Sequence, residues 1–451
     1  MLDVNDFEPG RRRTIEQRRP LIVAVMKAVG VLSALVVAGG VAMAQPAPAP
    51  SGSSLKLEDA IQLALRRNER ARIADLDIVV AEAAVTKARA AFLPVLSANG
   101  NDTLHWHSDP TNTAQAALNV NQPLISPPSW PLYSQAKHQL AGQRAQSTDD
   151  KRQIAYDAAT AFINVLLTEE VLKAAQRKLD TAKADLADTD AQVKAQLVSS
   201  NDVTRAQIGM SSSVREVASD QGKVDDAYVQ LGLLLNQRIT GGLEIPTGLL
   251  ASGVKPLPAA ESLVDTSLKQ RPDLVARKEA ALAAHDFARE PRMRWFPSLS
   301  LNGQLSATSQ ADRDNNHLDG TIGLAASWTL FDAGVRTADA RSRDAQAEIS
   351  ELTTLNLIRT IDAQVRSASA SLISAQQALI AANDAMVAAR KSADETAILY
   401  HQQLAKAIEL LDANEQRFAA EVNFAEAQFS VASAYLALRQ AMGLEPIGDL
   451  P

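Results

Sequence analysis

Apolar residues recur at every seventh position along two stretches of this chain. They are Ala158, Val165, Leu172, Leu179, Leu186 and Val193 in the first stretch, and Val365, Leu372, Leu379, Met386, Ala393 and Tyr400 in the second. A strict seven-residue repeat makes a helix pack along one seam against a partner helix. Alanines occupy companion positions at Ala368, Ala375, Ala382 and Ala389, and again at intervals of seven from Ala413 to Ala441. Because small residues let helices approach closely, the pattern favours a wall of many helices; an ordinary two-stranded coiled coil is the alternative.

The first of these stretches lies in a segment of exceptional length. Residues 132–196 contain no proline and no clear helix break apart from Gly142. At ~1.5 Å per residue such a helix would be roughly 100 Å long, whereas an average helix has about 12 residues. A rod of this kind suits a structure that crosses distance rather than one that encloses a substrate.

Alternating patterns follow the prolines at 94 and 297. In the second half, Leu299, Leu301, Leu305 and Ala307 alternate with polar residues. Ile322, Leu324, Ala326, Trp328 and Leu330 alternate with small or polar residues, and residues 114–124 show a similar alternation in the first half. About a dozen residues suffice for a tilted membrane strand. Four strands cannot close a barrel alone, because open edges in lipid leave backbone groups unsatisfied, so several copies must share one barrel. A soluble sandwich is the alternative for these strands.

The chain is internally duplicated. "FLPVLSANG" at 92–100 and "WFPSLSLNG" at 295–303 belong to segments, 57–100 and 260–303, that align without a gap. The sequence of each half therefore predicts the same order of elements: a helix, a hairpin of two strands, a very long helix, a turn and a shorter helix. We place the first repeat at 55–238, an equatorial linker at 239–258, the second repeat at 259–443 and a C-terminal tail at 444–451. The fold class is mostly α with a β part.

The N-terminus has the composition of an export signal. Arg11–Arg13 and Arg18–Arg19 precede an apolar run that ends in Ala42-Met43-Ala44, which predicts a signal peptide over 1–44 with cleavage after Ala44. Translation from Met26 would give a leader of ordinary length, and a membrane-spanning anchor is the alternative. A Pro/Ser-rich leader, 45–54, follows. Because the chain has no cysteine, neither a disulfide framework nor a lipidated first residue is expected.

Charge and motifs argue against nucleic-acid binding and against enzymatic chemistry. The formal net charge is -7, and no Lys/Arg cluster follows the N-terminal segment. There is no phosphate-binding glycine loop, zinc-protease motif or cysteine nucleophile, so we expect no enzyme and no cofactor. The single metal-like spacing, His105-Trp106-His107, is interpreted as an exposed polar pair.

Several motifs in fixed order give the mature chain a family resemblance. These are "LEDAIQLALRRN" and "RPDLVARKEAALAA" at the openings of the halves, the two strand-entry phrases, "WTLFDAG" at 328–334, and the turns "LVSSNDV" and "AIELLDA". Over about 55–443 the chain resembles the TolC-type outer-membrane efflux proteins of Gram-negative bacteria. The resemblance implies a homotrimer in which each chain gives four strands to a shared 12-stranded β-barrel and long helices to an α-barrel in the periplasm.

The implied function is a passive exit duct in the cell outer membrane, in contact with outer-membrane lipid and extending into the periplasm. As part of a tripartite efflux or type I secretion system, it would join an inner-membrane pump indirectly, through a periplasmic adaptor (membrane fusion) protein, and the pump would choose the cargo. A periplasmic coiled-coil adaptor or scaffold protein is the alternative. A second rival, an exported hydrolase, would need a Ser/His/Asp cluster in space.

The resemblance also implies residues of a channel aperture. Glu409 and Asp412 match the family's acidic ring positions, where threefold symmetry would stack carboxylates that attract cations; alternatively they are solvated carboxylates at a helix start. Tyr400 matches the gate tyrosine and Asp202 the aspartate that it bonds in the closed state. Ala405 occupies the position of the family's arginine latch, which predicts a weaker closed state.

The two tip turns are the implied contacts of the adaptor. They comprise Leu197, Val198 and Ser199 at one turn, and Leu404, Ala405 and Lys406 at the other. As an alternative, these residues simply close helix hairpins. The chain departs from the family at Gln196 and Gln403, where glycine is usual, which puts the turn geometry in question. It also departs at "SPPSWP", 126–131, which predicts a remodelled strand-to-helix junction.

Overall fold

The computed structural model describes residues 54–106, 111–196, 198–309 and 316–450. All of the described residues belong to one unit of the chain, Gly52–Pro451. The predicted signal peptide lies outside the described residues, as does nearly all of the Pro/Ser-rich leader. Within the described ranges, none of the helices combines the length and the apolar character that crossing a membrane requires.

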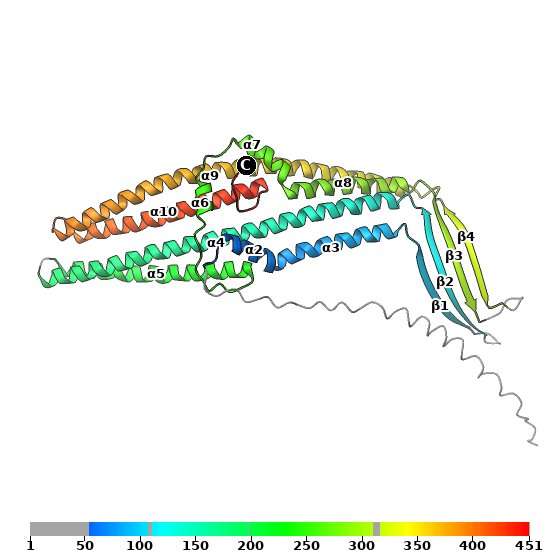
Figure 1. Cartoon of the computed structure of the whole chain (residues 1–451), viewed down its shortest axis with the longest axis horizontal. Coiled ribbons are helices and arrows are strands. Elements are labelled where there is room, and N and C mark those ends of the chain that lie inside the picture. Colours follow the sequence, from blue (N-terminus) through cyan, green and yellow to red (C-terminus); the bar gives the residue numbers. More distant parts are fainter. Residues whose placement is uncertain (1–53, 107–110, 197, 310–315, 451) are drawn as a thin grey trace, which may run out of the picture. The chain divides into compact units, whose positions relative to one another are not determined.

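The order of elements repeats across the two halves (Figure 1). The first half contains α2 (Leu57–Arg67), α3 (Glu69–Ala90), β1 (Val95–His105), β2 (Thr111–Ile125), α4 (Ser129–Lys194) and α5 (Ser200–Leu235). After α6 (Thr247–Gly253), the second half contains α7 (Ala260–Gln270), α8 (Pro272–Met293), β3 (Ser298–Thr308), β4 (Leu318–Ser327), α9 (Val335–His401) and α10 (Ala407–Met442).

The opening helix of each half is divided in two, where a single helix was predicted. In the first half, Asn68 has extended backbone angles, and its side chain accepts a hydrogen bond from the Arg70 backbone N–H to cap α3. In the second half, Pro272 occupies the first turn of α8 and keeps Arg271 extended. Different local chemistry therefore breaks the helix at equivalent places.

The predicted very long helices are confirmed. Helix α4 has 66 residues and α9 has 67, and each packs against the shorter helix that follows it, α5 or α10. Along the seven-residue stripes, Val165, Leu172, Val365 and Leu372 are fully or almost fully buried. The chain therefore forms two long helical hairpins, α4/α5 and α9/α10.

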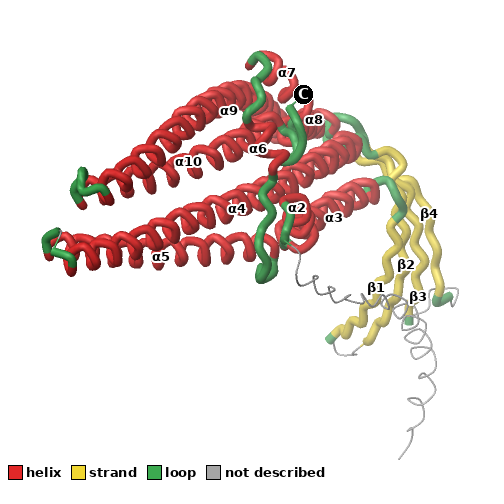
Figure 2. The backbone as a smooth tube through the Cα atoms, turned by 60° about the vertical axis from the view of Figure 1, so that its left-hand side comes forward, coloured by secondary structure: helices red, strands yellow, loops and turns green. Residues whose placement is uncertain are grey.

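The four strands form one antiparallel sheet in the order β1-β2-β3-β4 (Figure 2). Strand β2 joins the halves, because Leu118 pairs with Ala98 of β1 and with Leu305 of β3. The prediction that the last strand reaches Leu330 is wrong, since β4 ends at Ser327, opposite Ser298.

The early end of β4 has a local cause. The residue before Ser298 is Pro297, which has no N–H to continue the ladder. The indole of Trp328 instead donates a hydrogen bond to the backbone carbonyl of Trp295, at 3.0 Å. Trp328 is therefore held to the segment between α8 and β3 by its side chain and not by the sheet.

The two strand-to-helix junctions differ, as the sequence predicted. In the first half the hydroxyl of Ser126 lies 2.7 Å from that of Ser129, the first residue of α4. In the second half Gly334 has φ +89°, and the Asp332 carboxylate accepts hydrogen bonds from the backbone N–H groups of Gly334 and Arg336. A capped glycine turn thus begins α9, whereas a proline-serine turn begins α4.

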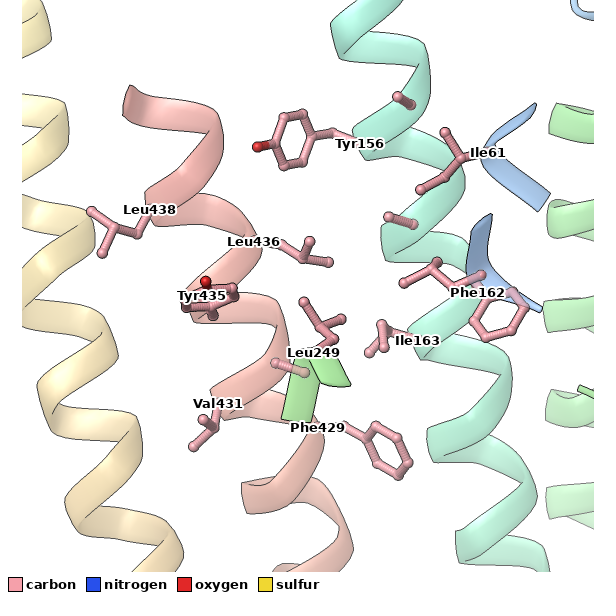
Figure 3. Close-up of a cluster of buried hydrophobic side chains, with 14 of the residues drawn as sticks. Ile61, Tyr156, Phe162, Ile163, Leu249, Phe429, Val431, Tyr435, Leu436 and Leu438 are labelled. Carbon is pink, nitrogen blue, oxygen red and sulfur yellow. The ribbon is translucent and has the colours of Figure 1, made fainter. Parts of the chain in front are cut away.

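The largest apolar core lies where α2, α6 and α7 pack on the long helices. Phe162 and Ile163 of α4 and Leu436 of α10 are at most 2% exposed. Figure 3 shows Ile163, Leu436 and Leu249 of α6 between α4 and α10, whereas Phe162 points from the other side of α4 towards α2. This core fixes the middle of both hairpins to each other.

Candidate functional site at the hairpin tips

The tip turns keep a left-handed backbone without glycine. Gln196 has φ +62° and Gln403 has φ +63°. After α9, the Leu404 N–H donates to the Leu399 carbonyl at 2.8 Å, which is the long bond of a Schellman cap. The glutamines therefore adopt the conformation for which glycine is the usual residue, at a cost of about 1 kcal/mol each.

Tyr400 lies at the last turn of α9 and is 3% exposed. Its hydroxyl is 3.2 Å from the Thr189 hydroxyl of α4. Thr189 uses its own proton to bond the Asp185 carbonyl at 2.7 Å, so Tyr400 is the donor to Thr189. This chain of hydrogen bonds connects the two hairpins just above their tips.

Asp202 lies in the first turn of α5, where it takes part in a capping box. Its carboxylate accepts a hydrogen bond from the Ser199 backbone N–H at 3.2 Å, while the Ser199 hydroxyl oxygen accepts one from the Asn201 N–H at 3.2 Å. Asp202 and Tyr400 line one cavity of about 450 Å³, together with Arg205 and Lys406. The structure thus brings the predicted gate pair to one cavity, with Tyr400 bonded to Thr189 and Asp202 to Ser199; their role as a gate stays a prediction.

Glu409 and Asp412 are both exposed in the first turns of α10. Glu409 accepts a hydrogen bond from the Lys406 backbone N–H at 3.3 Å, and Asp412 accepts one from the Gln416 amide at 2.8 Å. Leu410 and Ala413 are buried on the packed side of the same helix. Within one chain the two carboxylates therefore lie on the free side of α10, and their function as a ring stays a prediction.

The predicted adaptor contacts differ in exposure. Ser199, Leu404 and Lys406 are exposed, with Leu404 at 72%, whereas Val198 and Ala405 are half-buried. Leu197 lies outside the described residues. An exposed leucine at a turn is an apolar surface available for a partner.

Sequence reasoning did not single out Thr189 or Asp185. Thr189 is 3% exposed, although it is a polar residue in a mostly solvated part of α4. Burial raises the pKa of the Asp185 carboxyl above its ordinary value, against the hydrogen bond from Asn414 and the charge of Arg417. The sequence around Thr189 does not indicate its contact with Tyr400, because the two residues lie 211 positions apart in sequence.

Comparisons with known proteins agree with this architecture. Residues 60–237 and 263–444 match the model of a family described as outer membrane efflux protein. The structure of CusC, solved to follow folding and transmembrane channel formation, has a TM-score of 0.78 at 19% identity, over 86% of this chain and 92% of that one. The open state of the Neisseria gonorrhoeae MtrE outer membrane channel has a TM-score of 0.76 at 21% identity, over 87% and 90%. For the outer membrane protein VceC of Vibrio cholerae the TM-score is 0.75 at 17% identity, over 86% and 96%.

These structural likenesses, at such low identity, show a shared fold. The family model adds more, because its two matched segments cover most of the chain and contain both strand pairs and both long hairpins. This chain therefore belongs to the outer membrane efflux protein family and is a protein of the outer membrane.

Proposed function

We propose that this chain forms the exit duct of a tripartite efflux or type I secretion system. Three copies would surround one passive conduit across the outer membrane and periplasm, and a periplasmic adaptor would couple it to an inner-membrane pump. Each repeat, 55–238 and 259–443, would supply two strands and one long hairpin. The observation that carries the proposal is the four-stranded sheet with two free edges, β1 and β4, attached to helices of 66 and 67 residues.

The free edges support assembly into a shared barrel. Unpaired backbone groups in the hydrocarbon region cost several kcal/mol each, so β1 of one copy must pair with β4 of the next. The sheet also carries exposed apolar side chains, with Ile322 at 85% and Leu324 at 68% exposed on one side of β4. Lipid contact would remove this apolar surface from water.

The assembly can be tested on the mature protein expressed in a Gram-negative host. We expect recovery from the outer-membrane fraction only with detergent, at three times the mass of the mature chain, and single-channel conductance in planar bilayers. A water-soluble monomer or dimer would contradict the duct and favour the periplasmic scaffold.

Neutralising the acidic pair should change the ion preference of the channel. In the double variant Glu409→Gln with Asp412→Asn, the cation-to-anion permeability ratio is expected to fall several-fold towards unity, because three copies would lose six carboxylates at the constriction. Reversal potentials in a salt gradient measure this ratio. The variant Glu409→Asp with Asp412→Glu keeps every charge and should keep the preference. If neutralisation leaves the ratio unchanged, the two residues are ordinary solvated carboxylates.

Removing the Tyr400 hydroxyl should weaken the closed state. A single hydrogen bond contributes about 0.5–1.5 kcal/mol, so Tyr400→Phe is expected to raise resting conductance and antibiotic leak moderately, without loss of trimers. Tyr228→Phe is the matched control, since it removes a hydrogen bond of 2.6 Å that the Tyr228 hydroxyl of α5 donates to the Glu169 carboxylate of α4, far from the tips. Equal conductance in wild type and Tyr400→Phe would count against this gate.

A further inference from the structure

The contact between α4 and α10 changes character along its length. In its equatorial part, where α2, α6 and α7 also pack, Ile163 and Leu166 of α4 belong to the same apolar core as Phe429 and Leu436 of α10. Figure 3 shows Ile163, Phe429 and Leu436. Closer to the tips, hydrogen bonds and ion pairs join the same two helices. They involve Arg177, Lys178, Thr181 and Asp185 of α4, and Asn414, Glu415, Arg417 and Glu421 of α10.

Lys178 is the centre of this polar contact. Its side chain is 12% exposed, and its ammonium group donates to Glu216 of α5 at 2.8 Å and to Glu415 of α10 at 2.7 Å. The ammonium also lies 4.4 Å from the centre of the Phe418 ring. Burial acts to lower the pKa of Lys178, but the hydrogen bonds and charges of the two carboxylates raise it overall. Lys178 is therefore a half-buried cation that binds three helices together.

Glu421 makes a second junction six residues beyond Glu415, nearly two turns further along α10. Its carboxylate is 12% exposed and accepts hydrogen bonds from Arg177 of α4 and from Arg390 of α9, both at 3.0 Å. Burial acts to raise the pKa of Glu421, and the two arginines outweigh it and lower the pKa overall. The two junctions together connect all four helices of the two hairpins.

Water can replace these contacts when the hairpins separate. A cavity of about 30 Å³ lies among Lys178, Asp185, Asn414 and Glu421, with room for a water molecule. An ion pair contributes little free energy relative to its two ions when each is hydrated. Even for a buried pair the net contribution is small, although removing only one partner is costly. The apolar core has no such substitute, because exposing it costs about 25 cal/mol per Å². The polar contact can thus open while the core stays closed.

We propose that the Lys178 and Glu421 junctions form a second latch, separate from the tip residues, which holds the α9/α10 hairpin against α4/α5 and sets how far the tips part. The equatorial core acts as the hinge. Lys178 is a positioning residue in this device, since it acts through the hairpins and touches no cargo. The inference rests on the proposed duct, because a latch controls flow only if the tips enclose an aperture.

The test uses the full-length trimer in two readouts. Lys178→Met keeps an apolar stem but leaves Glu216 and Glu415 unpaired, so resting conductance in planar bilayers should rise several-fold. Because the chain has no cysteine, spin labels at Ser199→Cys and Leu404→Cys report the distance between the two tips, in trimers diluted with unlabelled chains. That distance should lengthen in Lys178→Met and return to the wild-type value in Lys178→Arg.

Lys183→Met is the matched control. Lys183 is an exposed lysine of α4 that pairs with Asp180 of its own helix. It should change neither readout. If Lys178→Met does not assemble, Glu421→Gln tests the other junction in the same way. Wild-type conductance with no difference between Lys178→Met and Lys183→Met would overturn the latch. A lengthened tip distance in a protein that does not conduct would support the latch and contradict the duct.

Discussion

Replacing Phe162 with alanine is expected to lower the free energy of unfolding by about 3–5 kcal/mol. Phe162 has no exposed surface, and it lies in the core that α4 shares with α2, α6 and α10 (Figure 3). The core also includes residues of α5, α7, α8 and α9, and the long helices among these elements cannot collapse into a void without moving over their whole length. The cavity would therefore stay largely open. Urea unfolding of the detergent-solubilised protein, followed by circular dichroism, measures the loss.

Two controls separate the cavity from a general effect of substitution. Phe162→Leu keeps much of the volume and should cost less than about 1.5 kcal/mol. Leu233→Ala changes an apolar side chain of α5 that is 72% exposed, and should stay within about 0.5 kcal/mol of wild type. Equal losses for Phe162→Leu and Phe162→Ala would show that the packing around Phe162 is loose and that the core does not act as a rigid hinge.

The sequence predicted the long elements because their patterns repeat many times. The prediction from the stripe between Ala158 and Val193 depends only on a local helix and on an apolar partner for it. Both are present in the structure. Elements that end through one local interaction were less predictable. The end of β4 depends on the Trp328 indole and the Trp295 carbonyl, 33 positions apart, and the break between α2 and α3 depends on the single cap of Asn68.

The candidate site shows a similar division. The tip positions of Tyr400, Glu409 and Asp412 follow from the turns, which a short motif identifies. The partner of Tyr400 does not, because its bond to Thr189 crosses between helices. The bonds from Lys178 to Glu216 and Glu415 cross between helices in the same way. In addition, a helix segment with a lysine and several acidic residues looks the same in sequence whether it is packed or exposed to solvent. Only the low exposure of the Lys178 side chain, 12%, distinguishes it from a solvated helix face, and this exposure depends on the packing of three helices.

Replacing Gly443 with alanine is the second large effect that we expect, at about 2–5 kcal/mol of lost stability. Gly443 ends α10 with φ +81°, and a Cβ atom there would lie 2.7 Å from Arg271 Cγ and 2.9 Å from Arg271 Cα. Arg271 cannot move aside easily, because its guanidinium bonds Asp273, Gln364 and the Ala441 carbonyl. Urea unfolding measures the loss, as for Phe162→Ala.

Two further glycines separate the causes of this loss. Gly334 has φ +89° but open space around the Cβ position, so Gly334→Ala carries the conformational cost alone, about 1–2 kcal/mol. Gly222 lies inside α5 with ordinary angles and open space, so Gly222→Ala should stabilise the chain by about 0.5–1 kcal/mol. We therefore expect the order Gly443, Gly334, Gly222 from most to least destabilising. If Gly443→Ala cost no more than Gly334→Ala, the close contact with the Arg271 backbone would be absent, and the C-terminus of α10 would not be fixed to the junction between α7 and α8.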